Sequence, residues 1–376
     1  MILPRFYQLN KYLEPNKVLV IYGSRQTGKT TLLKNFLSSV KLKYKFDSGD
    51  NIKIQQILSS QDFSKIDEYA SGYKLIVIDE AQRIPNVGMG LKILVDQIPN
   101  IKIIATGSSS FELSGQIGEP LTGRKKTLIL YPISQLELVK IYNVYELKEK
   151  LPEFLVFGGY PAVLTAKTKI NKISTLEEII NSYLLKDILE LEKIKSSKIL
   201  LDLLRLIAFQ TGDEVSLTEL GALLGLDYKT IARYLDLLEK SFVLFNLRGF
   251  SKNLRKEITK KSKYYFYDTG IRNAVISNFN NLEMRDDVGK LWENFLVVER
   301  LKTQQYHNIF ANNYFWRTWD KKEIDWVEER EGKLFGFEFK FLAAKTKIPQ
   351  EFLQTYSNAK IEIITRENYL KFLQVK

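Results

Sequence analysis

The segment that most constrains the fold of this chain is KVLVIYGSRQTGKTTLLKNFL, residues 17–37. It opens with an apolar run, residues 18–22, which is typical of a strand buried on both faces of a sheet. Residues 23–30 then fit the pattern G-x-x-x-x-G-K-[ST], and residues 31–37 have apolar side chains at helical spacing. Strand, glycine-bounded loop and helix in this order predict a phosphate-binding unit.

The residues of this loop have distinct predicted roles towards a nucleoside triphosphate and its metal ion. Gly23 and Gly28 allow a tight turn whose backbone N–H groups surround the phosphates. Lys29 is expected to reach the β- and γ-phosphates, and the Thr30 hydroxyl to bind Mg²⁺. ATP and Mg²⁺ are therefore the predicted cofactors. The predicted contacts of the loop with ATP are Gly23, Ser24, Gln26, Thr27, Gly28, Lys29, Thr30 and Thr31.

An acidic pair follows a second apolar run in YKLIVIDEAQR, residues 73–83. Residues 75–78 are typical of a parallel strand, and Asp79 stands at its carboxyl end, where open α/β sheets bind their ligands. We expect Asp79 to hold Mg²⁺, directly or through water, and Glu80 to polarise the attacking water. The two acids therefore predict ATP hydrolysis as well as ATP binding.

Three further segments extend the predicted sheet, within residues 43–50, 101–115 and 125–132. Five strands with intervening helices indicate a parallel sheet with helices on both faces. The second of these segments ends its apolar run in a polar tip that includes Thr106 and Ser108.

Arg124 stands just before the last of these strands, in EPLTGRKK. Two interpretations remain open. As an arginine finger it would stabilise charge on the nucleotide of a neighbouring subunit, which requires a homo-oligomer. Otherwise it is a surface cation.

The motifs GSRQTGKT, IDEAQ and TGSSS, in this order, resemble those of the AAA+ ATPases, particularly a prokaryotic branch. The resemblance covers about residues 1–140 and implies an ATPase module. In that family the polar residue after the fourth core strand senses the γ-phosphate, a role that the resemblance assigns to Thr106 or Ser108.

The middle of the chain changes character after the turn FGGYPAVL, residues 157–164, which we expect to mark the passage out of the ATPase module. Residues 174–210 have helical spacing. Residues 216–250 then predict a helix-turn-helix, with Ser216 capping the first helix and Asp227 the second. The start of the second helix is expected to enter the major groove of DNA.

A basic turn between two predicted strands, residues 251–263, resembles the wing of a winged helix. Its cations are Lys252, Arg255, Lys256, Lys260, Lys261 and Lys263, a concentration that suits phosphate contacts. The predicted DNA contacts are Lys229, Thr230 and Arg233 of the helix and Lys252, Arg255 and Lys256 of the turn. The alternative is a winged helix that binds protein or closes over the ATPase module, with a solvated basic loop.

Side chains alternate strictly along residues 334–341, LFGFEFKF. Four phenylalanines therefore face one side of the predicted strand, while Glu338 and Lys340 face the other. The phenylalanines predict a core. Glu338 and Lys340 are either the solvated side of an amphipathic sheet or part of a second active site.

Upstream acids favour a second site. Glu293 lies on a predicted helix, outside its apolar stripe, and Asp325 lies on a predicted strand. Asp325 and Glu338 would converge on Mg²⁺ or Mn²⁺, with Glu293 completing the metal site and Lys340 orienting or activating water. This order is that of the PD-(D/E)xK nuclease core. Because such folds also occur without activity, a scaffold without catalysis remains an alternative.

The motifs FGGYP, LLKDILEL, YDTGIRNAV, LWENFLVVERL, WRTWDKKEIDWV and FEFK together resemble one prokaryotic family. That family joins an AAA-type ATPase to a C-terminal domain of unknown function with nuclease-like features. The resemblance covers nearly the whole chain.

Composition narrows the remaining choices. The net charge of +12 makes a polyanion a plausible partner. The absence of cysteine excludes disulfides and thiolate zinc sites, and a single histidine, His307, excludes histidine-cluster metal sites. The polar N-terminus and the lack of a long apolar run predict a cytoplasmic protein without membrane contact.

These observations predict an α/β chain with three domains. They are an AAA+ P-loop ATPase with a parallel sheet (residues 1–150), a helical and winged-helix region (151–275) and an α/β restriction-endonuclease-like domain (276–376). The predicted function is Mg²⁺-dependent ATP hydrolysis that couples nucleotide state to DNA binding or processing. The alternative is a nucleotide-gated switch that binds a protein partner, with an inactive nuclease-like scaffold.

Overall fold

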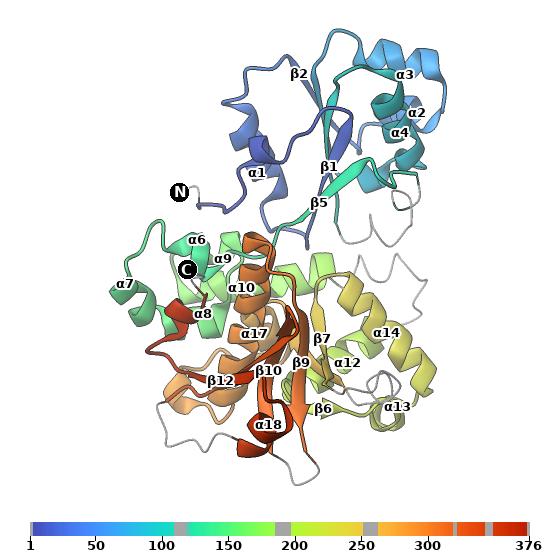
Figure 1. Ribbon diagram of the computed structural model, residues 1–376. Coiled ribbons are helices and arrows are strands. Elements are labelled where there is room, and N and C mark those ends of the chain that lie inside the picture. Colours follow the sequence, from blue (N-terminus) through green and yellow to red (C-terminus); the bar gives the residue numbers. More distant parts are fainter. Residues whose placement is uncertain are drawn as a thin grey trace. The chain divides into compact units, whose positions relative to one another are not determined.

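The computed structural model describes residues 3–108, 118, 120–184, 197–250, 262–318, 322–342 and 349–373. The chain divides into two compact units (Figure 1). The N-terminal unit comprises Tyr7–Tyr131 with Lys240–Phe242, and the C-terminal unit comprises Met1–Phe6, Pro132–Glu239 and Val243–Lys376. The sequence predicts three domains, whereas the structure unites the second and third in one unit.

A five-stranded parallel sheet forms the centre of the N-terminal unit, with strand order β2-β3-β4-β1-β5. The predicted parallel sheet is therefore confirmed. Its central strands consist of buried apolar residues, because helices cover both faces. The strands are β1 (Lys17–Tyr22), β2 (Tyr44–Ser48), β3 (Leu75–Asp79), β4 (Lys102–Thr106) and β5 (Lys125–Ile129).

The helices of this unit divide between the two faces of the sheet. Alternate β1 side chains, such as Val18 and Val20, share a core with the helices after β2 and β3. Figure 1 shows α1 on one side of β1 and α2, α3 and α4 on the other. Side-chain caps begin two of these helices: Asn51 accepts from the Lys53 N–H, and Asp62 from the Ser64 and Lys65 N–H groups. The helices are α1 (Lys29–Leu37), α2 (Ile52–Ser59), α3 (Phe63–Ala70) and α4 (Val87–Gln97), with 3-10 turns at Leu9–Lys11 and Ala81–Arg83.

A seven-stranded sheet runs through the C-terminal unit in the order β12-β11-β10-β9-β7-β8-β6. The strands are β6 (Glu214–Val215), β7 (Leu244–Gly249), β8 (Ser262–Phe266), β9 (Asn312–Arg317), β10 (Glu323–Arg330), β11 (Lys333–Phe339) and β12 (Ala359–Ile364). Parallel pairing of β7 with β9 joins the strands of the predicted helix-turn-helix region to those of the predicted nuclease-like region. This shared sheet is the physical reason that the two predicted domains form one unit.

Helices cover this sheet and build two hydrophobic cores. They are α6 (Gln135–Leu138), α7 (Val144–Glu149), α8 (Leu151–Phe157), α9 (Pro161–Thr165), α10 (Lys169–Glu178) with a π-helical turn at Ile179–Leu184, α12 (Ser197–Phe209), α13 (Leu217–Leu224), α14 (Tyr228–Lys240), α16 (Thr269–Val275), α17 (Val288–His307), α18 (Gln350–Thr355) and α19 (Tyr369–Leu373). A 3-10 turn spans Leu282–Met284.

Helix α17 packs at the centre of this unit. The spacing of its apolar residues predicts a helix with one buried face and one solvated face, and the structure differs from this. The buried residues of α17 include Glu299, Arg300 and Lys302 as well as Trp292. Such buried charges require partners, and Arg300 forms a two-pronged ion pair with Glu328 of β10. The polar face of α17 is therefore internal rather than solvated.

Strand β11 has the alternation that its sequence predicts, but neither face is solvated. Phe337 and Phe339 enter the core with α17 and α19, and the Phe337 ring lies 4.8 Å from that of Phe372. On the other face, Leu334 joins a second cluster that includes Ile324. Glu338, which the alternation places among these residues, is consequently buried.

No helix in the parts of the chain that the structure describes combines the length and the apolar character needed to span a membrane.

Two glycines of the C-terminal unit test how closely its elements pack. A Cβ at Gly158, whose φ is +74°, would lie 2.0 Å from the Asp268 carboxylate, whereas a Cβ at Gly289 meets nothing within 4 Å. We expect Gly158→Ala to lower the free energy of unfolding by about 2–4 kcal/mol through overpacking and backbone strain. Gly289→Ala, the control within helix α17, should raise it by up to about 1 kcal/mol. Chemical denaturation measures both, and equal effects would contradict the packing described.

Candidate functional site

The phosphate loop between β1 and α1 is shaped by its glycines. Gly23 has φ of 151°, and a Cβ there would lie 2.2 Å from the carbonyl oxygen of Leu130, just after β5. Gly28 has φ of 92° and begins α1 in the left-handed region. The Lys29 ammonium donates to the carbonyl oxygens of Gly23 and Ser24, at 2.8 and 3.0 Å. The loop therefore holds the lysine over the cradle where phosphates bind in such loops.

The other predicted loop residues are distributed around this cradle. Thr27 is buried and its hydroxyl donates to the Ser24 carbonyl at 2.8 Å. Gln26 is half-buried with a φ of 60°, and Thr31 is exposed on α1.

Asp79 brings three elements together at the carboxyl end of the sheet. Its Oδ2 accepts a hydrogen bond from the Thr30 hydroxyl of α1 at 2.7 Å. Its Oδ1 accepts one from the Thr106 hydroxyl of β4. The structure thus places Thr30, Asp79 and Thr106, which lie far apart in the sequence, in direct contact.

This oxygen pair fits a magnesium ion. Mg²⁺ binds oxygen at about 2.0–2.1 Å in octahedral geometry, so adjacent ligands lie roughly 2.9 Å apart. The Thr30 and Asp79 oxygens, at 2.7 Å, have nearly that spacing. Both belong to the hard oxygen donors that Mg²⁺ prefers.

Glu80 follows Asp79 in a left-handed conformation, with φ of 52°. Such a backbone is costly for a residue other than glycine and is often found at functional sites. The Glu80 N–H donates to the Thr106 hydroxyl at 3.1 Å, and its carboxylate accepts from Gln82. Thr106 therefore orients both acids. Ser108, the other sensor candidate, is also buried just beyond β4.

Arg124 lies at the opposite end of the sheet from the phosphate loop. It precedes β5, whose amino end is far from the carboxyl ends where Asp79 and Thr106 stand. Its guanidinium is partly exposed and pairs with Asp96 of α4, Nε to Oδ1 at 2.6 Å. Arg124 therefore does not reach the nucleotide site of its own unit.

The four predicted residues of the C-terminal site come from α17 (Glu293), β10 (Asp325), β11 (Glu338) and the residue just after β11 (Lys340). Burial raises the pKa of Asp325 well above its ordinary value, and the charges of Glu293 and Glu338 raise it further. The Asp325 carboxylate accepts from the Phe339 N–H at 2.7 Å. Lys340 pairs with Glu338, Nζ to Oε1 at 2.7 Å.

The geometry of this acidic cluster nevertheless differs from the predicted metal site. Within the described residues, no group of three or more acidic or histidine side chains is arranged to hold a metal ion. The cluster contains a cation of the chain instead. Lys263 of β8 pairs with Glu293, Nζ to Oε1 at 3.4 Å, and with Glu323.

Lys263 corrects a prediction from the sequence, which counts it among the solvated cations of the basic turn. It is 2% exposed. The alternation along β8 contained the signal, because it places Lys263 on the same face as Tyr265, whose hydroxyl donates to Glu293 at 2.6 Å. A residue this deep does not contact DNA.

The residues of the predicted helix-turn-helix lie on α13 and α14. Ser216 caps α13 by accepting from the Glu219 N–H, and Gly225 ends that helix with φ of 67°. Asp227 accepts from both the backbone and the hydroxyl of Thr230, so that this hydroxyl serves the start of α14. Lys229 and Arg233 are exposed on α14. Lys252, Arg255 and Lys256 lie outside the described residues.

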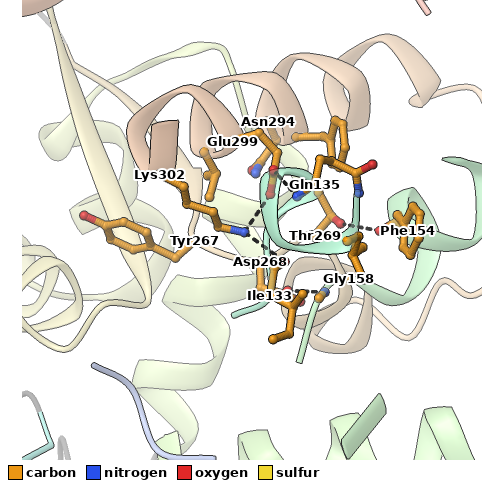
Figure 2. A pocket seen from close by; sticks show the side chains of 14 residues that line it. Ile133, Gln135, Phe154, Gly158, Tyr267, Asp268, Thr269, Asn294, Glu299 and Lys302 are labelled. Carbon is orange, nitrogen blue, oxygen red and sulfur yellow. Dashed lines mark hydrogen bonds and ion pairs between the residues drawn. The ribbon is translucent and has the colours of Figure 1, made fainter. Parts of the chain in front are cut away.

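Sequence reasoning missed a polar cluster around the FGGYP turn, which is part of the C-terminal core rather than a passage between domains. The Asp268 carboxylate accepts from the Gly159 N–H at 2.7 Å and from the Ile271 N–H at 3.1 Å. Figure 2 shows Asp268 beside Lys302, around a small polar cavity. The glycines themselves were a signal in the sequence: in the structure Gly158 meets Asp268, and Gly270 meets the Phe157 carbonyl.

A second contact fixes the chain where it enters the C-terminal unit. Glu299 of α17 accepts from the Gln135 N–H at 2.7 Å and pairs with Lys302 at 2.7 Å. Figure 2 shows Glu299 and Lys302 on one helix, both directed at this cluster. The segment after β5 is therefore anchored to α17 by buried charges.

Asp268 should make stability depend on pH. Burial raises its pKa from 3.8 to about 6, so the native chain binds a proton that the unfolded chain has already released between these values. The contribution of Asp268 to the free energy of unfolding should therefore fall by about 2 kcal/mol as pH rises from 4 to 7. The difference between wild type and Asp268→Asn, from denaturation at each pH, measures it. Parallel pH profiles would contradict this prediction.

Comparison with known proteins identifies the parts of the chain. Residues 15–139 match a family model described as an AAA domain. Residues 148–282 match a domain of unknown function (DUF8612), and residues 288–372 match another (DUF4143).

Two similar proteins are each named "Uncharacterized protein". One from Mycobacterium tuberculosis is 28% identical over 342 residues, covering 89% of this chain and 72% of that protein. One from Haemophilus influenzae is 26% identical over 387 residues, covering 96% and 92%. A Thermotoga maritima RuvB structure is 19% identical and covers 61% of this chain and 81% of its own, with a TM-score of 0.28. The chain is thus similar to an AAA domain in its N-terminal third and to domains of unknown function in the rest.

Proposed function

We propose that the N-terminal unit binds ATP with Mg²⁺ and hydrolyses it, and that its nucleotide state controls the binding of DNA by the C-terminal unit. The observation that carries the first part is the contact of Thr30 with Asp79 beside the phosphate loop. The proposal is supported by the match of residues 15–139 to the AAA domain model.

Each residue of the ATP site has a role that follows from its position. Backbone N–H groups of the loop and the Lys29 ammonium bind the phosphates. Thr30 and Asp79 hold Mg²⁺, which supplies charge neutralisation at the transferring phosphoryl group. Glu80 orients the attacking water, and Thr106 fixes the positions of Asp79 and Glu80 through its hydrogen bonds.

Arg124 suits a role between subunits. Since it stands at the end of the sheet opposite its own phosphate loop, it serves only a nucleotide bound by a neighbouring copy. The proposed active form is accordingly a homo-oligomer in which Asp96 holds the arginine until the neighbour is present. If the chain works as a monomer, Arg124 is a surface cation.

DNA binding is proposed for the helix-turn-helix region, which has the order of elements of a winged helix. Three helices, α12, α13 and α14, accompany the three antiparallel strands β6, β8 and β7. Lys229 and Arg233 project from the second helix of the motif, α14, where phosphate and base contacts are made in such proteins. The net charge of +12 adds long-range attraction to a polyanion.

A second candidate function is a nucleotide-gated switch that recognises a protein partner, with the nuclease-like part as an inactive scaffold. One specific observation favours it: a buried lysine, Lys263, lies within the acidic cluster that would hold the catalytic metal ion. The two candidates share the ATP site and differ in the partner of the C-terminal unit.

Loss of the loop lysine tests the ATPase. Lys29→Ala should abolish measurable hydrolysis and weaken ATP binding, because the cation that contacts the β- and γ-phosphates is removed. Lys34→Ala is the matched control, since it removes an exposed lysine of the same helix. Steady-state phosphate release measures both, and turnover by Lys29→Ala at the wild-type rate would refute the assignment.

Charge reversal on α14 tests DNA binding. Lys229→Glu with Arg233→Glu should weaken binding at least 10-fold and reduce the slope of log affinity against log salt by about 2, because two phosphate contacts are lost. Lys169→Glu with Lys198→Glu makes the same charge change at exposed positions of α10 and α12. Fluorescence anisotropy with ATP, with ADP and without nucleotide measures affinity.

The control pair distinguishes the candidates. An equal loss of DNA affinity in the α14 variant and in the control variant would show that net charge alone attracts DNA. No binding to DNA in any nucleotide state, or binding that does not respond to salt, would favour the protein-binding switch.

A further inference from the structure

The acidic cluster of the C-terminal unit has an internal cation in its middle. Lys263 Nζ lies 3.4 Å from Glu293 Oε1 and bonds Glu323, and it stands 5.2 Å above the centre of the Phe315 ring. The carboxylates come from three elements: Glu293 from α17, Glu323 and Asp325 from β10, and Glu338 from β11. The lysine comes from a fourth, β8.

The carboxylates in this region outnumber its cations even when the lysine is included. Four carboxylates face Lys263, Lys340 and, at the rim, Arg317, which approaches Glu323 at 3.6 Å. Lys340 is only partly buried and pairs with Glu338 alone among the described carboxylates. Lys263 is thus the buried cation nearest to Glu293 and Glu323, and its electrostatic effect extends to Asp325.

One carboxylate oxygen of the cluster is not reached by the lysine. Oε2 of Glu338 is buried and has no hydrogen-bond partner among the described residues. The Glu338 residue as a whole is only 9% exposed. An unpaired buried carboxylate oxygen is costly, so this oxygen would be available to a metal ion once the lysine is removed.

We propose that the Lys263 ammonium takes the place of a divalent cation in this cluster, so that the C-terminal unit keeps the nuclease-like scaffold but does not bind a catalytic metal ion there. A lysine and a metal ion satisfy the same carboxylates in different ways. Mg²⁺ needs several oxygens at about 2.0–2.1 Å from one point, whereas an ammonium donates to two or three carboxylates that stand farther apart.

The lysine also has a structural consequence. β8 belongs to the helix-turn-helix region, whereas Glu293 and Glu323 belong to the nuclease-like region. The ion pairs of Lys263 therefore cross between these regions, alongside the hydrogen bond of Tyr265 to Glu293 and the pairing of β7 with β9. The Lys263 ammonium therefore both excludes the metal ion and joins the two regions.

Titration with Mn²⁺, followed by the electron paramagnetic resonance signal of the free ion, tests the proposal on the full-length chain without nucleotide. All proteins carry Asp79→Asn, which removes the carboxylate of the ATP site. Lys263→Met should gain one Mn²⁺ site at least 10-fold tighter than any in the parent, and adding Asp325→Asn should abolish it. Lys302→Met is the matched control, because it removes a buried lysine that pairs with a single glutamate, and it should gain no site.

Two outcomes overturn the proposal. In the first, the parent protein already binds Mn²⁺ in this cluster and Asp325→Asn removes that ion. Mn²⁺-dependent nicking of plasmid DNA by the parent that is lost on Asp325→Asn counts equally. The other is a folded Lys263→Met that gains no site. If Lys263→Met does not fold, Mn²⁺ binding and nicking are compared between the parent and its Asp325→Asn variant instead. Equal absence of Mn²⁺ binding and of nicking supports the proposal, and loss of either on substitution overturns it.

Discussion

The contact on which the N-terminal unit depends is the pair of hydrogen bonds that the Asp79 carboxylate accepts from Thr30 and Thr106. These residues come from α1, β3 and β4, and the parallel order β3-β4-β1 brings the ends of these strands to one edge. The buried apolar strands hold that arrangement in place, so a hydrophobic core fixes the position of a polar site. The Thr30 and Asp79 oxygen atoms consequently stand close to the spacing of adjacent Mg²⁺ ligands.

The C-terminal unit is organised around buried charge. Arg300 with Glu328, Lys302 with Glu299, and Lys263 with Glu293 are ion pairs along or beside α17. A buried pair of this kind contributes little net stability, but loss of one partner leaves an uncompensated charge. Such pairs therefore specify which elements pack together, and here they connect α17 to β8, to β10 and to the segment after β5.

Local patterns in the sequence were enough to predict the candidate ATP site, because its determinants are local. The glycines, Lys29 and Thr30 lie in one loop, and Asp79 follows an apolar run that can only be a buried strand. The parallel sheet follows from similar runs. Contacts such as Thr106 with Glu80 refine this site without changing it.

Long-range pairing has no comparable local signal. No pattern in the residues of β7 or β9 predicts that these strands pair. Their pairing joins two regions that the motifs assign to separate domains. The sequence also did not predict the burial of α17 on nearly all sides. Charged residues such as Glu299 and Lys302 indicate a solvated face unless their partners are known. Lys263 combines both difficulties, since its partners lie 30 and 60 residues away. The alternation of β8 was the one available signal.

The most direct test of this account is a calorimetric titration of ATP with and without Mg²⁺. The account predicts that Mg²⁺ strengthens ATP binding to the wild type, and that Asp79→Asn removes this dependence while ATP alone still binds to the loop. Asp67→Asn, at an exposed position of α3, should behave as wild type. An Asp79→Asn variant that keeps the full Mg²⁺ dependence, or a wild type that shows no binding of ATP, would contradict it.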